Sequence, residues 1–126
     1  MARTARVRTI LVALTRKAGL TVRHRTGRAD EFPRARDMAY CLCHRTGDVP
    51  LIVTAPKLER QSIERIAGVL AHELGHCAAF IAGMPDHREV DADRWGSTLT
   101  GLPVRYDREA VETIGRGTRR PEHLPR

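Results

Sequence analysis

The stretch between residues 62 and 82 constrains the fold more than any other part of the sequence. Its apolar residues recur every three or four positions, which is the spacing of one face of an α-helix. Gly83 and Pro85 follow directly and are typical of a helix end. The pattern therefore predicts one long helix, buried along the stripe formed by Ile63, Ile66, Ala67, Leu70, Leu74, Ala78 and Ile81.

The chain before this helix predicts one further helix and three short strands. Residues 5–18 place apolar side chains on one face and most arginines on the other, as an amphipathic helix does. Alternation or a short apolar run predicts strands at residues 20–25, 38–44 and 49–54. Because Gly47 and its neighbours are typical of a turn, we expect the last two strands to form a hairpin.

The chain after the long helix predicts a second helix that returns across it. Asp86 is the expected N-cap, and residues 90–99 are the expected body of this helix. A short strand at 102–106 and a short helix at 107–115 would follow. With 126 residues the chain is expected to form one domain of the α+β class, covering residues 1–115, with a flexible basic tail at 116–126.

The long helix carries a pattern with a specific chemistry, His72-Glu73-Leu74-Gly75-His76. Its two histidines are four residues apart, so both imidazoles project from one face and can bind a single Zn²⁺. Glu73 is offset around the helix, where it can contact a water on the metal and take its proton. This arrangement is the signature of a zincin, and we interpret His72 and His76 as metal ligands and Glu73 as the catalytic base.

A catalytic zinc needs a third protein ligand and an open position. In metzincins that ligand follows the second histidine at short spacings, where this chain has Ala79 and Ala82, so that class is excluded. The remaining candidates in the next part of the chain are His87, Glu89, Asp91 and Asp93.

Three short stretches between residues 38 and 103 occur together in one known group of metallopeptidases. They are Leu-Ala-His-Glu-Leu-Gly-His at 70–76, Glu-Val-Asp-Ala-Asp at 89–93 and Leu-Pro at 102–103, after the predicted hairpin. With them the chain resembles a minimal gluzincin, nearest to the ImmA/IrrE-like domains. The resemblance implies that Glu89 is the third ligand of one zinc ion and that Asp93 accepts a hydrogen bond from a ligand histidine. Asp91, Trp95 and Gly96 depart from the family pattern.

Two other interpretations compete for Glu89. It could close a capping box with Asp86 and serve only to begin its helix. In addition, a long helix that ran as far as Gly83 would climb about 10 Å beyond His76 at 1.5 Å per residue, which would bring Asp93 level with the zinc. A helix ending near residue 80 would keep Glu89 in place.

The resemblance also implies a reaction and a substrate class. The expected activity is that of a zinc-dependent endopeptidase, which acts on a protein or peptide. In such folds an extended peptide adds to the edge strand that borders the cleft, and residues 51–54 are the expected strand. His87 and Tyr106 are candidates for stabilising an oxyanion. Such proteins often occur in phages and mobile elements, which is a further expectation.

The charge of the chain suggests an alternative function. The net charge is +7, with 20 arginines and two lysines; residues 1–36 carry +8, residues 37–100 carry −3 and residues 101–126 carry +2. A basic N-terminal third is compatible with a nucleic-acid-binding or virion-associated module without proteolytic activity. Few aromatic residues are present for base stacking, and an arginine-rich outer face of an amphipathic helix explains the same residues.

The sequence has three cysteines, Cys41, Cys43 and Cys77. This small and odd number does not indicate a disulfide framework. We expect buried thiols in a reducing cytoplasm, because a structural zinc site would need four converging ligands. No apolar run is long enough to span a bilayer, and no signal peptide is recognised. The oligomeric state stays open.

Overall fold

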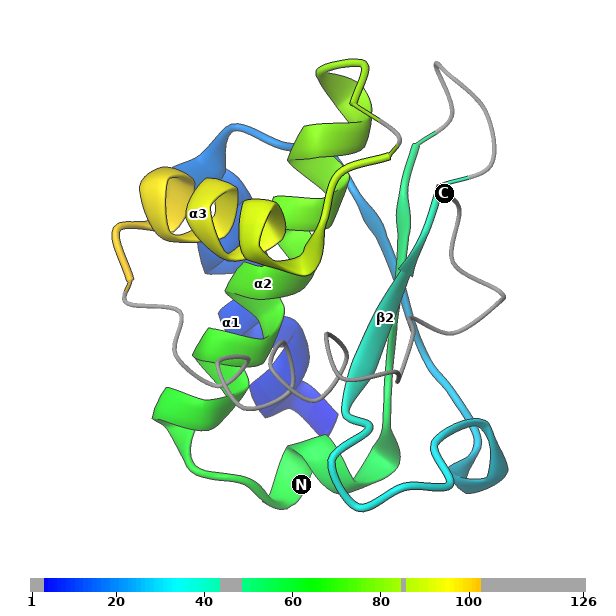
Figure 1. Cartoon of the computed structure of the whole chain (residues 1–126). Helices are drawn as coiled ribbons and strands as arrows, with labels where there is room; N and C mark the ends of the chain where they lie inside the picture. The colour runs from blue at the N-terminus through cyan, green and yellow to red at the C-terminus, as the bar shows by residue number, and fades with distance from the viewer. Residues whose placement is uncertain (1–3, 44–48, 85, 103–126) are drawn as a thin grey trace.

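The computed structural model describes residues 4–43, 49–84 and 86–102 (Figure 1). Within them the chain forms three α-helices and one mixed three-stranded sheet, which confirms the α+β class. In chain order the elements are α1 (Thr4–Ala18), β1 (Arg23–Thr26), the 3-10 turn η1 (Ala29–Glu31), β2 (Ala39–Leu42), β3 (Leu51–Thr54), the 3-10 turn η2 (Pro56–Arg60), α2 (Ile63–Ile81) and α3 (Glu89–Thr100). No helix in these residues is long and apolar enough to cross a membrane.

The strand order in the sheet is β1-β3-β2. β3 pairs in parallel with β1, where His24 lies opposite Ile52, and antiparallel with β2, where Tyr40 lies opposite Val53. The predicted pairing of the second and third strands is therefore confirmed. The expectation that residues 51–54 form an edge strand is wrong, because both sides of β3 are already paired. Its near-continuous apolar run, with Ile52 and Val53 completely buried, is typical of a central strand.

α2 forms as predicted and provides much of the core. Ser62 is its N-cap and accepts a hydrogen bond from the Arg65 backbone N–H at 3.1 Å. At the other end Ala82 is the C-cap, and Gly83 follows with a φ of 83°, a left-handed conformation that glycine adopts without strain. The buried face of α2 packs with α1 and the sheet through Val7, Leu11, Leu14, Cys41, Ile52, Ile66, Val69, Leu70, Leu74 and Cys77.

α3 lies across α2 at a very close crossing (Figure 1). A Cβ atom on Gly75 would collide with the backbone carbonyl oxygen of Ala92, and one on Gly96 would collide with that of Ala71. Only glycine at these two positions lets the helix backbones approach so closely. Gly96, one of the departures from the family pattern, therefore has a packing role in this chain.

α3 begins later than expected. Its N-cap is Arg88, whose backbone N–H donates to the Asp91 carboxylate at 3.0 Å, so the prediction of Asp86 as N-cap is wrong. Asp91 stands at the third helical position, where a carboxylate reaches back to the cap. The strand expected at 102–106, the helix at 107–115 and the tail at 116–126 lie outside the described residues, apart from residue 102.

His24 on β1 gives a prediction about stability and pH. Arg8 Nε donates to His24 Nδ1 at 3.0 Å, and His24 Nε2 lies 2.8 Å from Thr54 Oγ1. Partial burial and then the charge of Arg8 lower the pKa of His24 from 6.5 to about 4. Because the unfolded chain binds this proton more readily, the free energy of unfolding should fall as pH drops from 6.5 to 4.5. After allowance for solvent screening we expect a loss of about 1–2 kcal/mol.

Urea unfolding of the metal-free chain at pH 7 and pH 4.5 measures this effect. In a His24→Gln variant the difference between the two pH values should shrink by the same amount. An equal pH dependence in both proteins would contradict the assignment, because other groups would then be its source.

Candidate metal centre

The two histidines of the signature lie on one buried face of α2. His72 is 2% exposed and His76 is 3% exposed, and their ring centroids are 4.6 Å apart in an edge-to-face arrangement. One helical turn separates them, so both rings point toward α3, which packs closely on this face. The predicted placement of the histidine pair is therefore confirmed.

Glu89, the first residue of α3, brings a carboxylate to this pair. Its Oε1 lies 2.9 Å from His72 Nε2 and 2.9 Å from His76 Nε2. The three donor atoms all lie within 4.8 Å of one another, close enough to bind a single ion. Burial raises the pKa of Glu89, but the contacts with His72 and His76 outweigh burial and hold that pKa well below its usual range. An ionised Glu89 carboxylate at this position is a negatively charged ligand for a cation.

The outer nitrogen of each histidine has a partner of its own. His72 Nδ1 lies 2.9 Å from Asp93 Oδ1, and a carboxylate at this position accepts a hydrogen bond from the imidazole N–H. His76 Nδ1 lies 2.7 Å from His87 Nε2, while His87 Nδ1 donates to the Met84 carbonyl oxygen at 2.6 Å. Because His87 donates from Nδ1, its Nε2 is the acceptor in the contact with His76, and His76 carries its proton on Nδ1. With Nδ1 of each ring engaged in this way, both Nε2 atoms face Glu89, which is the orientation that metal binding requires.

These contacts separate the roles of Glu89 and Asp93. α2 ends at Ile81, close to the end near residue 80 that keeps Glu89 in place, and Glu89 and not Asp93 faces both Nε2 atoms. The close crossing at Gly75 explains this result, because α3 lies across α2 instead of running straight back beside it. The alternative capping box is absent, since Asp91 caps the helix and leaves the Glu89 carboxylate to the histidines.

The other predicted residues have different positions. Glu73 is 4% exposed and follows His72 directly on α2. His87 lies behind His76, and the engagement of both its ring nitrogens does not suit the expected stabilisation of an oxyanion. Its contact with Met84 was not predicted, because a lone histidine in a loop has no sequence signal for the carbonyl it meets. Tyr106 lies outside the described residues.

The three cysteines are free and buried, as expected. Their convergence was not expected. Cys41 Sγ lies 3.3 Å from Cys43 Sγ and 3.0 Å from Cys77 Sγ, although Cys77 belongs to α2 and the other two to the region of β2. They form a second group of side chains that could hold a metal ion.

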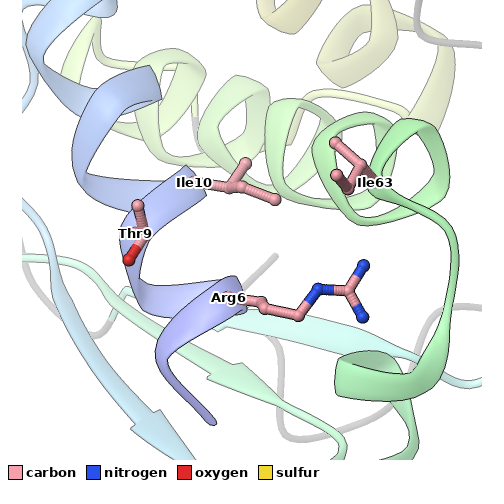
Figure 2. Close-up of a pocket in the computed structure, with 4 residues that line it drawn as sticks. All are labelled: Arg6, Thr9, Ile10 and Ile63. Atoms are coloured by element: carbon pink, nitrogen blue, oxygen red, sulfur yellow. The ribbon is translucent and has the colours of Figure 1, made fainter. Parts of the chain in front are cut away.

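A shallow apolar groove lies elsewhere, where the N-terminal parts of α1 and α2 meet (Figure 2). It is lined by Arg6, Thr9, Ile10 and Ile63. The Arg6 guanidinium donates to the backbone carbonyl oxygen of Glu59 at 2.8 Å, so its charge is used in the fold. The four lining residues include no acid and no metal ligand, and we assign the groove no chemistry.

Comparison with known proteins finds no matching family model, and no match among curated proteins or solved structures.

Proposed function

We propose that the protein is a zinc-dependent metallopeptidase whose zinc is held by His72, His76 and Glu89. The observation that carries this proposal is the convergence of two Nε2 atoms and one carboxylate oxygen, each within 4.8 Å of the others. Partners on both Nδ1 atoms add support, since they orient the imidazoles for a metal. The resemblance of residues 70–76 and 89–93 to minimal gluzincins points the same way.

The donor set fits zinc. Two imidazole nitrogens and one carboxylate are the protein ligands of several catalytic zinc sites, which keep a fourth position open. When bound, zinc supplies Lewis acidity that polarises a peptide carbonyl and makes a water more acidic, toward a pKa of about 7. The net charge of −3 over residues 37–100 suits a divalent cation in an otherwise basic chain.

Glu73 is proposed as the group that moves the proton. It neighbours a ligand histidine on α2 and is buried, so its carboxylate works in a region where water does not screen it. Its role is to accept a proton from the attacking water and deliver it to the leaving amide nitrogen. Asp93 and His87 hold the two ligand rings and so act as positioning residues.

The peptide is proposed to bind along β2. β3 is paired on both sides, so the free edges in the described sheet belong to β1 and β2. Of these, β2 lies beside α2, since Cys41 on β2 contacts Cys77, the residue that follows His76. An extended substrate could add to this edge through backbone hydrogen bonds, with its scissile bond directed toward the histidine pair.

Nucleic-acid binding is the weaker alternative. Several arginines of the basic N-terminal third are used within the fold: Arg6 donates to the Glu59 carbonyl, Arg25 pairs with Glu31, Arg28 with Asp30, and Arg34 with Asp37. Such pairing reduces the positive charge that remains to bind phosphates. It supports the interpretation of these residues as a solvated and internally paired surface.

Metal analysis tests the proposed ligands. The purified chain should contain one zinc per molecule by elemental analysis. Glu89→Ala should weaken zinc binding by at least about 100-fold, because a ligand is lost, and Asp93→Asn by about 10–100-fold, because only the support of His72 changes. Asp86→Asn is the matched control, since this exposed acid lies just before α3 and should leave zinc binding unchanged.

Circular dichroism of each variant establishes that it is folded. A folded wild-type chain that takes up no zinc, or a Glu89→Ala variant with undiminished zinc affinity, would contradict the proposal.

A further inference from the structure

Cys41, Cys43 and Cys77 form a sulfur cluster, whose donor atoms differ in kind from those of the histidine site. Cys41 is 3% exposed, Cys43 is 2% exposed and Cys77 is completely buried. Their three Sγ atoms lie within 4.8 Å of one another, and the group contains no nitrogen or oxygen donor from the described residues. Cys41 and Cys77 are 36 positions apart in the sequence, and they come from β2 and from the C-terminal part of α2.

Packing of the core does not by itself require three thiols that converge on one point. A buried cysteine behaves as a small apolar side chain, and its S–H is a weak donor. Any small apolar residue could fill one such position in the core. Three thiols that converge on one point from two elements instead provide a preformed set of soft ligands.

We propose that Cys41, Cys43 and Cys77 form a second metal site, which binds one soft, thiophilic cation, Cu(I). Soft thiolate ligands select soft ions, of which Cu(I) is the first-row example. Zinc also binds thiolates, but its structural sites take four ligands, and the group in the described residues supplies three. Cu(I) accepts a low coordination number, so three sulfurs complete its surroundings.

The two sites are separated by the kind of donor each provides. His76 directs its Nδ1 to His87 and its Nε2 to Glu89, so neither nitrogen is directed to the sulfurs. Nitrogen and oxygen ligands in one group and sulfur ligands in the other would sort a borderline ion from a soft one. Since Cys77 follows His76 directly, an ion on the sulfurs would also tie β2 to α2 beside the histidine site.

A Cu(I) titration tests this site. The full chain is freed of metal, reduced, and titrated under argon with the Cu(I)–acetonitrile complex, in competition with the chromophoric chelator bicinchoninate. One Cu(I) per chain should bind with a sulfur-to-copper absorption band in the ultraviolet. Cys41→Ala should weaken this binding at least 100-fold, because Cys41 contacts both other sulfurs. Cys43→Ser provides a second variant should Cys41→Ala not fold.

The histidine site supplies the matched control. His72→Ala should keep its Cu(I) affinity and the ultraviolet band, while it loses zinc, so that failure of this proposal is distinguished from failure of the proposed peptidase. X-ray absorption at the copper edge should show sulfur neighbours only. Loss of Cu(I) binding in His72→Ala, unchanged binding in folded Cys41→Ala or Cys43→Ser, or zinc held by the sulfurs as tightly as Cu(I) would each overturn the proposal.

Discussion

Glu73→Gln is expected to lower kcat/KM for peptide hydrolysis by about 10²–10⁴, the usual contribution of a general acid–base. The amide has nearly the same shape as the carboxylate but cannot accept the proton of the attacking water. Zinc content should not change, because the proposed ligands are His72, His76 and Glu89. A fluorescently quenched, denatured protein serves as substrate, and its cleavage rate is measured with the zinc-loaded enzyme.

The matched control is Glu64→Gln, the same substitution at an exposed position on the first turn of α2. This variant should cleave the substrate at the wild-type rate and fold equally well. A Glu73→Gln enzyme that retains both zinc and full activity would contradict the role of Glu73. If Glu73→Gln instead lost its zinc, the residue would belong to the metal ligands and not to the proton transfer.

The long helix and the histidine pair could be predicted from the sequence because both depend on local spacing. A stripe that repeats every three or four residues defines a helix, and two histidines four residues apart must then share its face. The antiparallel pairing of β2 with β3 was predictable for the same reason, since the two strands are neighbours in the chain.

Other features of the fold and of the site depend on contacts between segments that are far apart in the sequence. Local residue spacing contains no information about such contacts. The position of β3 between two strands follows from its parallel pairing with β1, whose partner lies more than twenty residues away. The convergence of Cys77 with Cys41 depends likewise on the packing of α2 against β2. Whether Glu89 or Asp93 faces both histidines depends on how α3 lies across α2. Gly75 and Gly96 permit this close crossing, and neither carries a polar side chain that would identify it in the sequence.

Gly75→Ala is expected to lower the free energy of unfolding by about 3 kcal/mol, the upper part of the usual range for overpacking a core. The new methyl group would meet the carbonyl oxygen of Ala92, which belongs to the backbone and cannot rotate away. α3 must therefore move outward, and Glu89 at its first position moves with it. We expect zinc affinity to fall at least about tenfold as the carboxylate leaves the two Nε2 atoms.

The sign of the effect distinguishes this cause from helix propensity. Glycine to alanine within a helix normally stabilises it by about 1 kcal/mol, so a loss of stability must come from the collision with α3. Gly96→Ala should act in the same direction through Ala71, and the double variant should lose less than the sum because both methyl groups separate the same pair of helices. Urea unfolding of the metal-free proteins measures these changes, with Glu64→Gln as the control expected to stay within about 0.5 kcal/mol of wild type. A stabilised Gly75→Ala variant with full zinc affinity would show that the crossing is looser than described and that Glu89 does not depend on it.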